Sequence, residues 1–148
     1  FNILDKLLFD EVREKDNLVY SISAGKNFDQ KIPIELISFY TYFNSDPKNI
    51  DIIKDKIDIE INKIKNKDFD LQIFKDQKLA LKNNYKTSGE TNSFWLGALK
   101  DAKQNGLNIE RISYREAMLN SITINDIVKL ANYYFDENYL RSVSLVAE

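Results

Sequence analysis

The sequence predicts an α+β domain in which helices pack on one face of an antiparallel sheet. Three observations point to this fold class. Two segments rich in β-branched and aromatic residues follow one another near the start of the chain. A series of segments with apolar residues at helical spacing comes after them. The 148 residues contain no internal repeat and no linker-like stretch, so residues 1–148 are expected to form a single domain.

The first helix and the first strand are predicted from a change in apolar spacing. Apolar residues at helical spacing predict a helix from about Asn2 to Glu14, which Asp16–Asn17 ends. The next segment, from Leu18 to Ala24, alternates well enough to predict a strand. In this alternation Tyr20 falls on the same side as Ile22.

A second strand is predicted after a polar loop. The loop is Gly25 to Lys31, and the strand runs from Ile34 to Asn44. Because this strand is apolar on both faces, it is expected to be central, covered on both sides and paired on both edges. Some of its neighbours are expected upstream of Phe1, because Phe1 leads directly into an amphipathic pattern and the native start looks truncated.

The third predicted element is a long helix that begins at Asp46–Pro47. Asp is a favoured N-cap residue, and Pro is favoured at the first helical position. The opposite face of this helix consists of Lys and Asp and is interpreted as solvated. Isoleucines form the apolar stripe of the helix, at positions Ile50, Ile53, Ile57, Ile61 and Ile64.

The rest of the chain is predicted to be helical up to a last short strand. A second long helix is expected to end at the polar turn Thr87–Gly89, and Gly106 is expected to end a third. Thr123 and Asp126 have the spacing of a capping box at the start of a further helix. The segment Leu140–Ala147 is predicted to be a strand.

Two residue types are absent from the whole sequence, histidine and cysteine. The commonest general base, the thiol nucleophile and the preferred ligands of zinc are therefore missing. A zinc site built from carboxylates alone would suit that metal poorly. We therefore expect this chain to bind no metal and to be unable to catalyse peptide hydrolysis by itself.

Charge and apolar patterning exclude two classes of partner. Lys and Asp are mixed along the chain, the formal net charge is −2, and no basic block stands out, so a nucleic-acid partner is not expected. Every apolar stretch is interrupted within a few residues, far short of a membrane span, so no membrane insertion is expected.

One segment contains a candidate site. Val12–Ser21 reads V-R-E-K-D-N-L-V-Y-S, with Arg13 near a helix end and Tyr20 at the start of a strand after a polar turn. This segment resembles the R-x6-Y segment of the pitrilysin/insulinase family of zinc metallopeptidases, which includes the mitochondrial processing peptidases. Other segments resemble the same family in the same order: Phe39–Pro47, Asn92–Trp95, Ile122–Ile127 with Ala131, and Ser142–Val146.

The resemblance implies a fold and a different role for each of two domains. The family fold is a duplicated α+β domain, and two such domains close like a clamshell around an extended peptide substrate. The amino-terminal domain carries the zinc motif H-x-x-E-H, whose Glu is the base for the metal-bound water. The carboxy-terminal domain has lost that motif and offers an Arg and a Tyr across the cleft. Without His, this chain matches the carboxy-terminal type, with zinc held by another domain of the same chain or by a partner subunit.

By this resemblance Arg13 and Tyr20 bind substrate, and Tyr20 also donates a hydrogen bond in the transition state. Peptide hydrolysis builds negative charge on the carbonyl oxygen, which a tyrosine hydroxyl can stabilise without carrying a charge. Arginine presents a fixed fork of donors to carbonyls or carboxylates. Simpler roles exist for both residues: Arg13 as a surface ion pair with Asp10 or Glu14, and Tyr20 as a core residue.

Two other functions remain open from the sequence. The chain can belong to a family member that has lost catalysis and serves as a binding or assembly subunit. A zinc motif in the same polypeptide or in a partner favours the enzyme, and its absence favours the scaffold. Alternatively, the chain is an unrelated α+β binding module, which would be favoured if Arg13 and Tyr20 pointed to different surfaces.

Overall fold

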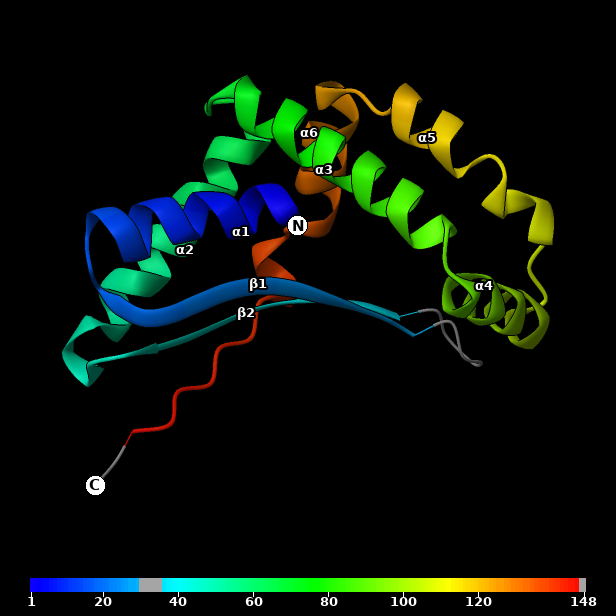
Figure 1. Cartoon of the computed structure of the whole chain (residues 1–148). Helices are drawn as coiled ribbons and strands as arrows, with labels where there is room; N and C mark the ends of the chain where they lie inside the picture. Colours follow the sequence, from blue (N-terminus) through cyan, green and yellow to red (C-terminus); the bar gives the residue numbers. More distant parts are fainter. Residues whose placement is uncertain (30–35, 147–148) are drawn as a thin grey trace.

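The computed structural model describes residues 1–29 and 36–146. The described part of the chain is mostly helical, with one pair of strands near its start (Figure 1). Three short 3₁₀ turns, Pro47–Asn49, Ile109–Ile112 and Glu137–Tyr139, lie between or after the main elements. In chain order these elements are α1 (Asn2–Leu8), a π-helix (Phe9–Lys15), β1 (Val19–Asp29), β2 (Leu36–Ser45), α2 (Ile50–Lys65), α3 (Leu71–Gly89), α4 (Asn92–Asn105), α5 (Arg115–Ser121) and α6 (Ile124–Tyr134).

The two strands form an antiparallel sheet with helices on one face only. In Figure 1, α1, α2, α3, α5 and α6 lie on the same side of β1 and β2. Ile22 of β1 is opposite Phe43 of β2, and both pack against the core on the helical side. Tyr40 and Tyr42 of β2 point the other way and are exposed. The predicted class, an α+β domain with helices on one face of an antiparallel sheet, is confirmed.

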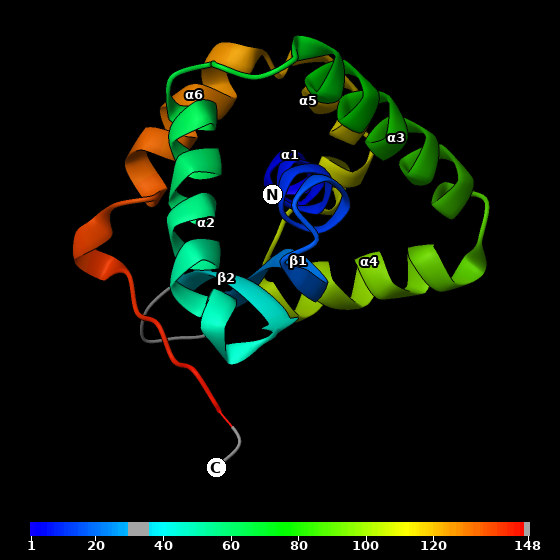
Figure 2. The ribbon, with the colours of Figure 1, turned by 90° about the vertical axis from the view of Figure 1, so that its left-hand side faces the viewer.

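The first helix is the centre of the hydrophobic core. Figure 2 shows α1 and the π-helix surrounded by α2, α6, α3 and the sheet. Leu8 and Val12 have no exposed surface, and neither does Ile53 of α2. The Asp5 carboxylate also accepts a hydrogen bond from the backbone N–H of Ala24, at 2.8 Å, and so joins α1 to β1. Burial of the apolar face of α1 between the other elements is the main source of stability in this arrangement.

Several helix ends follow the sequence signals. Gly106 ends α4 in the left-handed conformation, with φ 65°, as expected for a residue without a Cβ. Thr123 and Asp126 form the predicted capping box at the start of α6. At Asp46 the prediction was only partly right. Pro47 opens a 3₁₀ turn before α2, and the Asp46 carboxylate pairs with Lys48 at 3.1 Å instead of capping a backbone N–H.

Two predicted boundaries were wrong. The expected loop from Gly25 continues as strand through Asp29, because Gly25 lets the Tyr40 ring lie directly over it. A Cβ at Gly25 would stand 2.5 Å from atoms of that ring. The rest of the expected loop, and the expected strand start at Ile34, lie outside the described residues. The turn expected at Thr87–Gly89 is the last turn of α3.

The predicted last strand was wrong for the described residues, whereas the expected neighbours of β2 upstream of Phe1 stay a prediction. β2 has one neighbour, β1, and one of its faces is uncovered there. The segment Leu140–Val146 has no regular secondary structure, and its apolar side chains are exposed. A strand forms only where a partner supplies the hydrogen-bond ladder, so a β-rich sequence by itself does not make one.

The capping box of α6 makes stability depend on pH. The Thr123 hydroxyl, at 2.7 Å, and the Thr123 backbone N–H, at 2.8 Å, both donate to the Asp126 carboxylate and lower the pKa of Asp126. Because the folded-state pKa is the lower one, this stabilisation is present above the unfolded pKa of about 3.9 and is lost as the pH falls through the folded value. We expect Asp126→Asn to flatten the loss of stability below about pH 4, measured by urea unfolding at a series of pH values. An unchanged acid dependence in the variant would contradict this assignment.

Candidate functional site

The segment that contains Arg13 is a π-helix. The backbone N–H of Asp16 donates to the carbonyl of Glu11 at 3.1 Å, five residues back, which widens this last stretch compared with an α-helix. The Glu11 carboxylate accepts from Lys15 at 2.8 Å, and this hydrogen bond lowers the pKa of Glu11. The predicted helix over Asn2–Glu14 is therefore real, but its second half is not α-helical.

Arg13 is exposed and makes only local contacts within the described part of the chain. Its guanidinium lies over the Phe9 ring, 5.0 Å from the ring centroid, and its Nε is 3.9 Å from a carboxylate oxygen of Glu14. Ion pairs this exposed contribute little stability. Two ion pairs were considered for Arg13. The pair with Glu14 is present, whereas Asp10 pairs with Lys6. Most of the donor fork of Arg13 stays available to another molecule.

The turn between the π-helix and β1 is held from both sides. Asn17 adopts a left-handed conformation with φ 51°, which Asn tolerates better than most residues. The Leu18 N–H then donates to the carbonyl of Val12 at 3.0 Å. Asp16 forms an ion pair with Lys56 of α2, which fixes the end of the π-helix to that helix.

A β-bulge at the start of β1 sets the orientation of Tyr20. Val19 pairs with Ser45, and the next paired residue, Ser21, pairs with Asn44. Between these two pairs β1 moves forward by two residues and β2 by one, so Tyr20 is the extra residue of the bulge. Bulges of this kind change the direction of a side chain and are frequent beside active sites.

Because of the bulge, the side chains of this strand do not alternate between its two faces as predicted. Val19 and Ile22 are both buried on the helical side, although strict alternation would place them on opposite faces. Tyr20 is 73% exposed and does not share the face of Ile22, so the prediction that these two residues lie on one side was wrong. The simpler role considered for Tyr20, as a core residue, does not fit this exposure.

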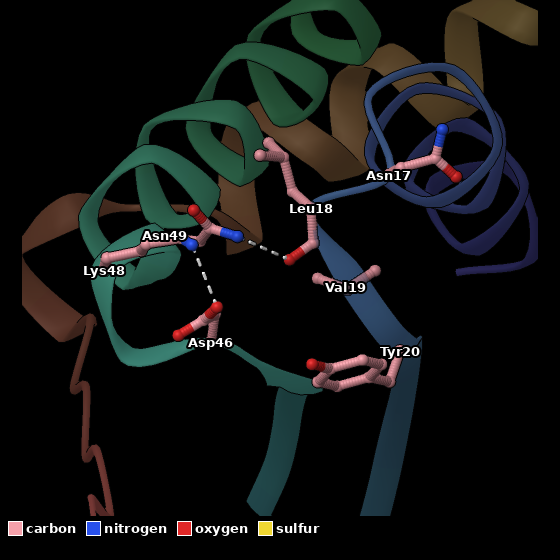
Figure 3. Close-up of a pocket in the computed structure, with 7 residues that line it drawn as sticks. All are labelled: Asn17, Leu18, Val19, Tyr20, Asp46, Lys48 and Asn49. Carbon is pink, nitrogen blue, oxygen red and sulfur yellow. Dashed lines mark hydrogen bonds and ion pairs between the residues drawn. The ribbon is translucent and has the colours of Figure 1, made fainter.

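Tyr20 borders a small polar pocket. Figure 3 shows its ring extending from β1 past the end of β2, with the hydroxyl on the side of Asp46. Within the described part of the chain this hydroxyl has no hydrogen-bond partner, so it is free to donate. Arg13 is not among the residues that line the pocket. The pocket has a volume of about 220 Å³ and is lined by Asn17, Leu18, Val19, Tyr20, Asp46, Lys48 and Asn49.

The far side of this pocket could not be found from the sequence. Asp46 was interpreted as a helix start within the family-like segment Phe39–Pro47, and Lys48 and Asn49 were given no role. Their position beside Tyr20 depends on the pairing of β1 with β2, which brings the end of β2 next to the start of β1. No local pattern carries that information, so no signal in the sequence placed these three residues beside Tyr20.

The residues of this chain do not fit a zinc site. The sequence has no His and no Cys, and over residues 1–29 and 36–146 no group of three or more acidic side chains could hold a metal ion. Carboxylates alone are also a poor ligand set for zinc. Among these same residues, no helix combines the length and the apolar character that crossing a bilayer requires.

The solved structures that are similar to this chain include the following two. A protease from Helicobacter pylori matches with a TM-score of 0.76 and 16% identity, over 92% of this chain and 34% of the protease. A conserved protein from Enterococcus faecalis V583 matches with a TM-score of 0.68 and 21% identity, over 88% of this chain and 31% of that protein. The chain thus spans about a third of the length of each. No curated protein matches the sequence.

Fold and site together define a class: an α+β domain with the fold of one part of a larger protease, and without a metal site in its described residues. The family model described as the peptidase M16 inactive domain matches residues 2–81, more than half of the 148 residues. The chain therefore belongs to the peptidase M16 family, that of pitrilysin and insulinase, as a non-catalytic, carboxy-terminal type of domain.

Proposed function

We propose that this chain is the substrate-binding, carboxy-terminal domain of a zinc-dependent metalloendopeptidase that cleaves extended peptides. In this proposal residues 1–148 form a single domain, and the zinc site, of the H-x-x-E-H type, is supplied by another domain of the same polypeptide or by a partner subunit. Arg13 and Tyr20 face the peptide across the cleft between the two domains.

The orientation of Tyr20 carries this proposal. A bulge directs a tyrosine away from the core, at the border of a polar pocket, and leaves its hydroxyl without a partner among residues 1–29 and 36–146. Because the large, exposed side chain of Tyr20 gains no burial energy from the bulge, a binding role explains this arrangement better than a structural role.

Chemically, the hydroxyl of Tyr20 suits the oxyanion that forms when water attacks a peptide carbonyl. The phenol donates one hydrogen bond without adding a charge, and it stabilises the transition state more than the ground state because the negative charge develops only there. Arg13 can bind a carbonyl or a carboxylate of the peptide through two parallel N–H groups. The cation–π contact with Phe9 holds the guanidinium at one place on the π-helix.

The function is tested on the complete native protein. Its zinc content is measured, and cleavage of an unstructured peptide is followed before and after treatment with a chelator. Cleavage that is lost with the chelator and restored by added zinc supports the proposal. A native protein with no zinc motif, no bound zinc and no zinc-bearing partner would instead favour the second function, a catalytically inactive family member that acts as a binding or assembly subunit.

Replacing Arg13 is expected to weaken substrate binding. In the active protein, Arg13→Ala should raise KM about 10-fold or more and change kcat less, because a charged hydrogen bond to a bound peptide contributes about 1.5–3 kcal/mol. Arg13→Lys should restore little, since Lys lacks the planar fork. The control is Arg111→Ala, which removes another exposed Arg from a 3₁₀ turn. An unchanged KM in Arg13→Ala would exclude Arg13 from the binding site.

A further inference from the structure

We infer that Asn49 is a positioning residue for Tyr20: by holding the carbonyl of Leu18, it fixes the bulge from which Tyr20 projects. This inference rests on the proposed function of Tyr20 and adds a residue on a different element. Asn49 closes the 3₁₀ turn just before α2, whereas Leu18 precedes β1 and lies 31 residues earlier in the chain.

The contact is a direct hydrogen bond between side chain and backbone. Nδ2 of Asn49 donates to the carbonyl oxygen of Leu18 at 3.2 Å in a partly buried position (Figure 3). The N–H of the same Leu18 donates to Val12 at 3.0 Å. Both polar backbone groups of Leu18 are thus fixed, one to the π-helix that carries Arg13 and the other to the turn before α2.

Asn49 is itself held firmly enough to act as an anchor. Its backbone N–H donates to the carbonyl of Asp46 at 2.9 Å and closes the turn that Pro47 opens. Proline restricts the backbone of this turn, and α2 follows immediately. Because Asn49 is half-buried and its amide donates to the Leu18 carbonyl, that amide has little freedom to move.

Tyr20 needs such an anchor because it is the bulge residue. The ladder pairs its neighbours Val19 and Ser21 but gives Tyr20 no partner, so its direction depends on how the backbone before it is fixed. Losing the hydrogen bond to Leu18 would leave that backbone free to shift. A displacement of about 1 Å at a reacting group can reduce a rate about 10²-fold, so even a partial shift should be measurable.

The experiment is a double-mutant cycle on turnover in the complete protein. Asn49→Ala should lower kcat roughly ten-fold and leave KM within about two-fold, because the hydroxyl is displaced from the developing charge while the rest of the substrate is still bound. Asn49→Asp, which has the same shape but no N–H to donate, should behave like Asn49→Ala. In a Tyr20→Phe background, Asn49→Ala should have almost no further effect.

The matched control is Asn66→Ala. Asn66 also donates through Nδ2 to a backbone carbonyl, that of Asn62 at 2.9 Å, but it lies at the other end of α2. Its removal should leave kcat unchanged. Hydrogen exchange provides a readout that needs no catalysis: the amides from Val19 to Ser21 should exchange faster in Asn49→Ala and at the normal rate in Asn66→Ala.

Two results would overturn the positioning role and leave the proposed function intact. One is a normal kcat and normal exchange in Asn49→Ala while Tyr20→Phe is slow. The other is an equal loss of kcat from Asn49→Ala with and without the Tyr20 hydroxyl, which would mark a general structural effect. If Tyr20→Phe itself cleaves at the normal rate, both the role of Tyr20 and the role of Asn49 are wrong.

Discussion

Replacing Tyr20 by Phe in the complete protein is expected to lower kcat/KM for peptide cleavage about 10²–10³-fold, the usual cost of removing one donor to a developing oxyanion. The loss should fall mainly on kcat, because the hydrogen bond strengthens only as the charge forms. Zinc content and folding stability should not change, since the side chain is 73% exposed and its hydroxyl has no partner in the described structure.

The matched control for this substitution is Tyr42→Phe. Tyr42 is another exposed tyrosine of the sheet, 64% exposed, next in the strand to Phe43, which packs against the core. Tyr42 lies opposite Ser23, away from the bulge. Steady-state kinetics of both variants, with metal analysis of each preparation, separate a catalytic hydroxyl from a surface one. Unaltered turnover in Tyr20→Phe would end the proposed role of this residue.

The largest expected effect on stability comes from Ile53→Ala in α2. Ile53 is fully buried and packs in the core around α1, so its truncation removes apolar contacts and leaves a cavity. Such changes cost about 2–5 kcal/mol. Ile52→Ala is the control, because the neighbouring isoleucine is 49% exposed and its loss should change the free energy of unfolding by about 0.5 kcal/mol or less.

Urea unfolding of the two isoleucine variants provides the measurement. Equal destabilisation by Ile53→Ala and Ile52→Ala would mean that α2 does not pack on α1 through the face described above. Destabilisation by Ile53→Ala alone would support the described packing of α2 in the core. It would also support the position of α2, to which the end of the π-helix and the turn of Asn49 are attached.

The helices were predictable because each carries its own periodic signal. The isoleucine stripe of α2 was read from spacing alone, and Ile53 and Ile64 are buried as expected. The caps at Gly106 and Thr123 were equally local. What spacing could not reveal was the change to a π-helix at Phe9, since a wider turn keeps nearly the same apolar face toward the core.

The strands were harder to predict because their structure depends on distant partners. The apolar and aromatic pattern of β2 suggested a strand covered on both faces, yet the structure leaves Tyr40 and Tyr42 exposed. Tyrosine accounts for part of this error, because its ring is apolar enough to imitate a core residue while its hydroxyl tolerates water. The Leu140–Val146 segment has strand propensity but no ladder in the described structure.

The sequence predicted Arg13 and Tyr20 as candidate site residues, which stays a prediction, but it did not predict the geometry around Tyr20. The motif around Arg13 and Tyr20 was visible in the sequence, whereas the outward direction of Tyr20 was not. That direction follows from a one-residue offset between β1 and β2, which only the cross-strand register reveals. Asn49 could not be found for the same reason, because its contact with Leu18 joins residues 31 positions apart.

The bulge also has an evolutionary consequence. Because Tyr20 is outside the pairing ladder and outside the core, the side chain at this position can change without disturbing either neighbour or the buried face of β1. Selection can therefore remove or restore the hydroxyl in one mutational step, at little cost to folding. With the proposed role of Tyr20, a lineage built on this backbone could lose most of its peptidase activity through one substitution and keep its fold throughout.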